Sequence, residues 1–198
     1  MANKLTTAGN AILLQYTAPI YVALFGYMFL GEKSSLIDWM TIVILLTGLG
    51  LFFIDELTLD GFIGNILAII SGMSFAALTL LLRKQKDESP SDSILFGNIL
   101  TLIIGLPIIT TGISIELKPI ILVLLLGVFQ LGVPYILYTM AIKHVKALDA
   151  IIFPIIEPIL NPILVFLILG ESLGPWSLLG GGMVLGGVIG RAILKESN

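Results

Sequence analysis

The chain alternates between long apolar stretches and short polar segments in which its charged residues cluster. Each apolar stretch is close to the roughly 20 residues that an α-helix needs to cross a bilayer. The pattern predicts about seven transmembrane helices, at residues 9–30, 37–54, 61–82, 93–112, 120–142, 148–169 and 176–190. Strands of membrane barrels are roughly 10 residues long and alternate in polarity. We therefore expect an all-α integral membrane protein.

Composition supports lipid as the surrounding solvent. The chain is 57% hydrophobic and 12% charged, whereas a soluble domain carries about 45–50% apolar and about 25% charged residues. It has no cysteine, which excludes disulfides and thiol chemistry, and its single histidine, His144, lies in a lysine-flanked polar segment. We expect no metal, cofactor or nucleic-acid partner. A membrane-embedded enzyme is disfavoured because it would need inward-facing carboxylates, His or Cys clustered at one interface, and the sequence offers no such cluster.

Lysine and arginine are distributed unevenly between the two sides that seven alternating helices define. One side receives only Lys4 and Lys118. The other side receives the remaining basic residues, which are Lys33, Arg83, Lys84, Lys86, Lys143, Lys146, Arg191 and Lys195. Positively charged loops stay in the cytoplasm. We therefore expect a cytoplasmic C-terminus, an external N-terminus and an external acidic segment at residues 55–60.

The segment KLTTAGNAILLQYTAPIYVALFGYMFLGE aligns without a gap with KHVKALDAIIFPIIEPILNPILVFLILGE, at an offset of 139 residues that places Lys4 on Lys143. The same offset places Gly48 on Gly187, so the first two predicted helices repeat as the sixth and seventh. The copies begin five helices apart, an odd number, and they therefore enter the membrane from opposite sides. Such inverted repeats are common in secondary transporters that work by alternating access.

Both copies contain a helix with a central proline that ends in Leu-Gly-Glu and is followed by a glycine-rich helix. The motif residues are Pro19, Gly31 and Glu32 in the first copy and Glu157, Pro158, Gly170 and Glu171 in the second. This pattern resembles the fourth and fifth helices of each repeat in EamA-like drug/metabolite transporters. The resemblance implies ten helices in two inverted repeats, a prokaryotic plasma-membrane location, and export of small metabolites, amino acids or drugs.

On that plan, residues 1–54 hold the last two helices of the first repeat and residues 61–198 form a complete five-helix second repeat. Projecting the offset back from Gly61 places roughly 80 residues, with three helices, upstream of the chain. We therefore expect an N-terminally incomplete, inverted-repeat transporter bundle that encloses a cavity for a small solute. The alternative is a truncated, transport-incompetent membrane fragment with only a packing or assembly role.

Glu157 is the only fully ionisable residue deep within an apolar stretch, about ten residues from either end of its predicted helix. Ionisable groups near the bilayer midplane are costly and are candidates for function. The carboxyl group either binds and releases protons or meets a cationic solute, or it is a structural hydrogen-bonding group. The first repeat has Ala18 at the equivalent position, so either role is asymmetric.

The sixth predicted helix contains three prolines spaced by four, which are Pro154, Pro158 and Pro162. Each removes a helical hydrogen bond and frees a carbonyl, which must find a partner in protein, water or solute. Asn161 lies one turn beyond Glu157 on the same face. In the first repeat, Pro19 frees the carbonyl of Gln15. The alternative is a kinked helix that is simply packed.

Further polar and small residues lie at helical spacing. Gln130 and Tyr138 share a face of the fifth predicted helix and either line the same cavity or form interhelical hydrogen bonds. A stripe of small residues, Gly182, Gly186 and Gly190, predicts close helix packing. Glu32 and Glu171 are expected to cap neighbouring helices or to join gating ion pairs at opposite membrane faces.

Overall fold

The computed structural model describes residues 2–109, 117–169 and 174–196 of the chain. Every regular element in these ranges is helical, which confirms the expected all-α fold class. Five helical stretches are long and apolar enough to cross a membrane, at Ala8–Leu30, Phe62–Lys84, Pro119–Ala141, Ala147–Leu164 and Pro175–Lys195. Two further apolar helices, Leu36–Phe52 and Pro90–Leu106, are shorter. The chain is a multi-pass integral membrane protein.

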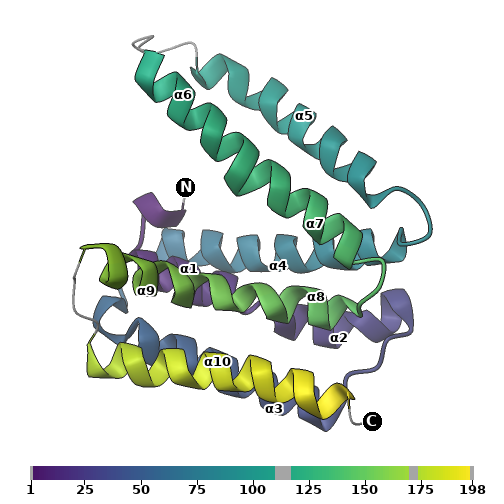
Figure 1. Cartoon of the computed structure of the whole chain (residues 1–198), viewed down its shortest axis with the longest axis vertical. Helices are drawn as coiled ribbons and strands as arrows, with labels where there is room; N and C mark the ends of the chain where they lie inside the picture. Colours follow the sequence, from purple (N-terminus) through teal and green to yellow (C-terminus); the bar gives the residue numbers. More distant parts are fainter. Residues whose placement is uncertain (1, 110–116, 170–173, 197–198) are drawn as a thin grey trace. The chain divides into compact units, whose positions relative to one another are not determined.

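The helices group into two compact units, Met1–Leu80 with Lys146–Asn198, and Leu81–Val145. Figure 1 labels the helices of both units. The first unit contains η1 (Ala2–Lys4), α1 (Ala8–Gln15), α2 (Ala18–Leu30), α3 (Leu36–Phe52), η2 (Ile54–Glu56), most of α4 (Phe62–Lys84), α8 (Ala147–Ile152), η4 (Phe153–Ile156), α9 (Glu157–Leu169) and α10 (Pro175–Glu196).

The first and sixth predicted helices are each interrupted near their middle. In the first, α1 and α2 are separated by Tyr16 and Thr17; in the sixth, a single 3-10 turn, η4, separates α8 from α9. The 139-residue offset carries the starts of α1, α2 and α3 onto those of α8, α9 and α10, and the end of α2 onto that of α9. The two segments therefore share their helix boundaries as well as their sequence pattern.

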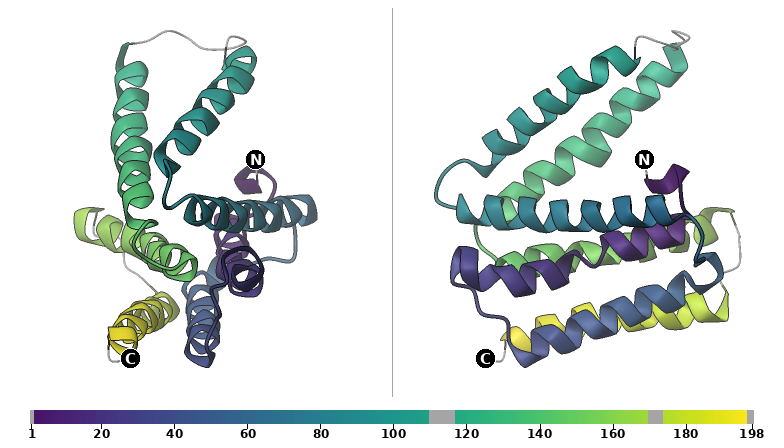
Figure 2. Two further views of the ribbon diagram at one scale, coloured as in Figure 1. Left: turned by 90° about the vertical axis from the view of Figure 1, so that its right-hand side faces the viewer. Right: turned by 180° about the vertical axis from the view of Figure 1, so that it is seen from behind.

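Helices α3 and α10 lie side by side over their length (Figure 2) and make the most extensive helix contact in the chain. A Cβ added at Gly48 would lie 2.9 Å from the carbonyl oxygen of Gly180, and one added at Gly180 would overlap that of Gly48. A Cβ at Gly187 would lie 3.3 Å from Leu45, while one at Gly48 would lie 2.9 Å from Val184. The offset exchanges these last two contacts, so the pair has an approximate internal twofold relation.

The core of the first unit consists of aliphatic side chains from its helices. Its fully buried members include Ala18, Leu45, Leu49, Ile151, Ile152, Ile155, Ile159 and Val184. The outer faces carry exposed apolar residues such as Met28 and Val43, which are 68% and 62% exposed. Extensive apolar surface of this kind is unusual on a water-soluble monomer and is the surface expected of helices surrounded by lipid.

The predicted packing role of Gly182, Gly186 and Gly190 is wrong for the described part of the chain. A Cβ added at any of the three would meet no atom within 4 Å. The close contact uses Gly180 and Gly187 instead, because these glycines lie on the face of α10 that α3 covers.

The second unit contains the end of α4 and three further segments. They are α5 (Pro90–Ile109), the helix formed by α6 (Leu117–Leu126), η3 (Gly127–Gly132) and α7 (Val133–Ala141) in succession, and the segment that leads to Val145. η3 is a π-helical turn, in which one residue is added to the usual helical repeat. Arg83 donates to the carbonyls of Ile142 and Lys143 at 2.9 and 2.8 Å, and this caps the end of α7.

Candidate functional site

The interruptions of the two repeated helices contact each other. The hydroxyl of Tyr16, between α1 and α2, lies 3.5 Å from the backbone carbonyl of Pro154 in η4, to which it donates. The same carbonyl accepts from the backbone N–H of Glu157. Pro158 has no N–H to give to this carbonyl, so the other two donors replace the missing helical bond.

The carbonyl of Gln15 occupies the equivalent place in the first repeat, since Pro19 lacks an N–H. It packs against α4 at Gly72, where an added Cβ would lie 2.7 Å from the carbonyl oxygen. Any side chain at Gly72 would push α4 away from the interruption. The two repeat-equivalent carbonyls that Pro19 and Pro158 deprive of an i+4 donor, those of Gln15 and Pro154, are therefore contacted by another segment of the first unit.

Glu157 and Asn161 are both exposed on α9, one turn apart. The same face carries exposed Leu160 and Leu164, at 45% and 51%. A carboxyl group and an amide are costly against lipid, so this face suits contact with water or with polar groups. The backbone N–H of Glu157 donates to the same Pro154 carbonyl that Tyr16 contacts, so Glu157 directly follows the contact between the two interruptions.

The prolines predicted to break helices differ in their positions. Pro19, Pro154 and Pro158 lie in the first turns of α2, η4 and α9 respectively. Proline is tolerated there because its missing N–H has no helical partner to lose within the new helix, and its fixed φ suits a helix start. Pro162 lies in the interior of α9. The interruption thus coincides with Pro154 and Pro158.

The remaining sequence-predicted polar residues lie in different parts of the chain. The side chain of Gln15 is exposed at the end of α1. Gln130 is exposed within the π-helical turn η3, and Tyr138 is half-buried in α7, both in the second unit. That Gln15, Gln130 and Tyr138 share a cavity with Glu157 remains a prediction.

Glu32 follows Gly31, whose φ of +70° ends α2 in the left-handed conformation that glycine adopts most readily. The Glu32 carboxylate accepts a hydrogen bond of 2.9 Å from the backbone N–H of Ala147 at the start of α8. A negative charge at a helix N-terminus complements the helix dipole. Of the two roles expected for Glu32, the structure shows capping. Gly170 and Glu171, its repeat equivalents, lie outside the described residues.

A buried ionic network, which the sequence analysis missed, joins α3, α8 and α10. Arg191 of α10 is 1% exposed, and its guanidinium pairs with carboxylates from two other helices. Nη1 donates a hydrogen bond to the carboxylate of Asp38 in α3. Nε and Nη2 donate to Oδ1 of Asp149 in α8 at 3.1 and 2.7 Å. The planar guanidinium, with its five donors, suits this bridging role.

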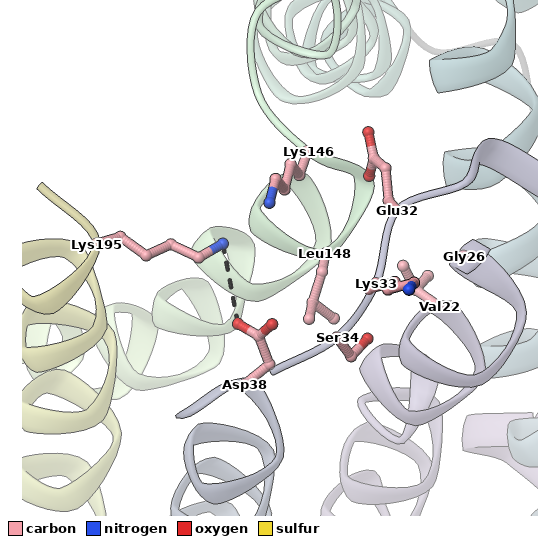
Figure 3. A pocket seen from close by; sticks show the side chains of 9 residues that line it. All are labelled: Val22, Gly26, Glu32, Lys33, Ser34, Asp38, Lys146, Leu148 and Lys195. Carbon is pink, nitrogen blue, oxygen red and sulfur yellow. Dashed lines mark ion pairs between the residues drawn. The ribbon is translucent and has the colours of Figure 1, made fainter. Parts of the chain in front are cut away.

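Lys195, one turn after Arg191, completes the network. Its Nζ lies 2.9 and 3.0 Å from the two carboxylate oxygens of Asp149, and 3.8 Å from Asp38 across a small pocket (Figure 3). Asp38 also accepts from the backbone N–H of Ser35 in a capping box at the start of α3. Two cations and two carboxylates balance in charge, which reduces the cost of burying them.

A network of neutral groups lies at the opposite end of the first unit. The repeat equivalent of Asp149 is Asn10, which is 5% exposed. Its amide donates to the carbonyl of Thr58 at 2.7 Å, to Thr6 at 3.1 Å and to Asn65 at 3.2 Å. The amide oxygen of Asn10 accepts from the backbone N–H of Thr58 at 3.2 Å. This network joins α1 to α4 and to the segment after α3.

The ionic network escaped the sequence analysis because its members lie at helix ends, where a charged residue is usually solvated. The repeat relates this network to a second contact between the same two helices. The offset places Asp38 on Ser177 and Arg191 on Phe52, and the hydroxyl of Ser177 donates to the carbonyl of Phe52 at 2.9 Å. The same two positions thus meet at both ends of the α3–α10 pair, by ions at one end and by a neutral hydrogen bond at the other.

Two curated relatives match this chain. An "uncharacterized transporter" of Archaeoglobus fulgidus is 30% identical over 196 residues, which cover 93% of this chain and 67% of that protein. An "uncharacterized transporter" of Clostridium kluyveri is 29% identical over 209 residues, which cover 98% of this chain and 66% of that protein. The chain therefore spans about two thirds of the length of these relatives.

No solved structure matches the chain. The EamA-like transporter family matches residues 1–54 and 62–191. These ranges include both of the interrupted helices and both members of the α3–α10 pair. The chain therefore belongs to the EamA-like transporter family.

Proposed function

We propose that this protein moves a small organic solute, such as a metabolite, an amino acid or a drug, across the plasma membrane of a prokaryote. Transport is export by alternating access between the inverted repeats, with the C-terminus in the cytoplasm. The protein has no catalytic role in this proposal. The observation that carries it is the pair of helix interruptions, at repeat-equivalent positions, that contact each other through Tyr16 and Pro154.

Interrupted helices support transport because their backbone carbonyls lack the usual i+4 helical donor and can accept from other groups in the interior of a membrane protein. Transporters of the inverted-repeat type place their solute and coupling-ion sites at such interruptions, near the bilayer midplane. In this chain the carbonyls of Gln15 and Pro154 lie at the two interruptions. The region around them is therefore where we place the solute.

Glu157 is the proposed coupling residue. It is the first residue of α9, directly after the interruption, and its side chain is exposed. A carboxyl group within a membrane helix is retained at a cost, and proton relays in transporters are built from such groups. We propose that Glu157 takes up a proton when the solute leaves, which couples export to proton entry, and that Asn161 lies along the same pathway.

The test measures solute movement in membrane vesicles that contain the protein, with and without an imposed pH gradient. The probes are a panel of radiolabelled amino acids and the cationic dye ethidium. We expect a pH gradient to accelerate movement of at least one probe, and Glu157→Gln to abolish that acceleration. The amount of protein extracted from the membrane reports whether the variant inserts normally.

Glu56→Gln is the matched control, since Glu56 is an exposed acidic residue in η2, at the end of the first repeat rather than within a membrane helix. It should leave the pH dependence unchanged. A Glu157→Gln protein that inserts normally and responds to the pH gradient as the parent does would remove Glu157 from coupling. Movement of none of the probes by the parent protein would contradict transport of these solute classes.

A further inference from the structure

We infer that Asp149, together with Arg191 and Lys195, forms a latch that holds α8 on α10 and closes one end of the bundle. The inference rests on the proposed alternating access, and it assigns a moving element to that mechanism. The latched end is the one that carries Lys146 and Arg191, and the orientation expected from the sequence places this end at the cytoplasm.

The α3–α10 pair is a fixed base for the latch. Gly48 and Gly180 bring the two backbones into direct contact, and Gly187 continues the contact against Leu45. Separating these helices would expose surfaces that fit each other closely and would open a void along the pair. Asp38 and Arg191, which join α3 to α10, therefore stay together when the bundle changes conformation.

Asp149 is the member of the network that is able to leave. It belongs to α8, a helix of six residues that ends at η4. The 3-10 turn and the prolines at 154 and 158 interrupt the α-helical hydrogen bonds between α8 and α9, and such interruptions are the usual places where helices bend. α8, whose Ile151 and Ile152 are buried in the core, would thus turn about η4 together with the side chains packed against it.

Release of Asp149 does not leave a buried charge alone. Arg191, the most deeply buried member, keeps its bond to Asp38. The side chains of Asp149 and Lys195 are 14% and 32% exposed, so both reach water with little movement. Removing the partner of a fully buried ion is costly. Here Arg191 would lose its two hydrogen bonds to Asp149 but keep its pair with Asp38, so the buried guanidinium is never left without a carboxylate.

The opposite end differs at the position that the latch uses. Asn10, at the position equivalent to Asp149, bonds Thr58, Thr6 and Asn65 and has no charged partner among the described residues. The residue at the position equivalent to Arg191 is Phe52, the last residue of α3. The latch is therefore specific to one end, and its strength biases which end of the bundle stays closed.

The chain contains no cysteine, so single introduced thiols report local opening without further changes. Ala150 in α8 and Ala11 in α1 are repeat equivalents, 6% and 4% exposed, and provide matched reporter positions. Ala150→Cys and Ala11→Cys are each made with and without Asp149→Asn. Asp149→Asn places in the second repeat the residue type that Asn10 provides in the first, and it leaves Arg191 paired with Asp38.

Labelling by a membrane-impermeant maleimide is measured in right-side-out and in inverted vesicles of the intact protein. For Ala150→Cys, we expect Asp149→Asn to raise the labelling rate about tenfold from the latched face, because the ion pair with Arg191 and Lys195 is replaced by a weaker bond to a neutral amide. For Ala11→Cys, the rate from either face should not change. Asp149→Glu, which keeps the charge, should restore slow labelling of Ala150→Cys to within about threefold of the parent rate.

An unchanged or lowered rate for Ala150→Cys would show that the network is a static brace, and the latch would be rejected. Equal increases at both reporters would indicate general loosening and would reject it as well. The assay contains no solute, so its outcome is separate from that of the transport assay. A latch confirmed here would stand even if Glu157→Gln left proton coupling unchanged.

Discussion

The two ends of the first unit are built from the same repeated helices, yet they are held in different ways. At one end Asp38, Asp149, Arg191 and Lys195 form a charged network of which Arg191 is the buried centre. At the other end three of the four equivalent positions carry the neutral residues Asn10, Phe52 and Ser177, of which Asn10 makes the most hydrogen bonds, and the fourth carries Glu56. The comparison shows that one backbone arrangement, used twice, can be joined by bonds of different strength and reversibility.

The physical difference lies in what happens when a partner is removed. Leaving a buried ion without its partner costs much free energy, because the ion stays desolvated. Removing one of several hydrogen bonds of a neutral amide costs much less. Mutations at the charged end should therefore lower the free energy of unfolding more than mutations at the neutral end.

Arg191→Met should have the largest effect, because it leaves the carboxylates of Asp38 and Asp149 near the protein interior with only Lys195 to neutralise them. We expect a loss of about 3–5 kcal/mol in the free energy of unfolding. The measurement is unfolding in mixed detergent micelles, followed by helical circular dichroism. A loss below about 1 kcal/mol would mean that the network adds little to stability.

Gly180→Ala tests the α3–α10 contact that both ends share. The added methyl group would overlap the carbonyl of Gly48 and lie 2.5 Å from the backbone nitrogen of Phe52, so the helices must separate, at a cost of roughly 1–3 kcal/mol. Gly182→Ala is the control on the same helix, where an added Cβ meets nothing within 4 Å. Equal unfolding curves for the two variants would contradict the close packing.

Ser177→Ala removes the neutral contact that stands where Asp38 and Arg191 meet at the other end. The lost hydrogen bond to the carbonyl of Phe52 should lower the free energy of unfolding by about 1 kcal/mol. The same detergent titration measures it. An effect as large as that of Arg191→Met would remove the proposed contrast between the two ends.

Glu32→Gln should have the smallest effect of the four. It replaces the carboxylate that accepts from Ala147 at the start of α8 with a neutral amide that can still accept. Loss of the charge at the helix N-terminus should cost about 0.5 kcal/mol. Glu32→Ala, which removes the acceptor altogether, should cost more, and the reverse order would show that the cap is not what the side chain contributes.

Much of the site followed from local sequence. Glu157 and Asn161 lie on one exposed face of α9 because residues four apart on a helix face the same way, and the interruption occurs at Pro154 and Pro158 because proline favours helix starts. The spacing did not reveal that the Tyr16 hydroxyl reaches the carbonyl of Pro154, since that contact joins residues 138 positions apart.

The sequence by itself determined that this chain crosses the membrane as helices and that two of its helices return 139 residues later with matching boundaries. Apolar runs and prolines act locally, so they can be read in order along the chain. Only the tertiary structure decided that Asp38 meets Arg191 and that Gly180 rather than Gly182 packs against α3. These choices depend on how far each helix is rotated about its axis, and that rotation is set by the fit of distant side chains against one another.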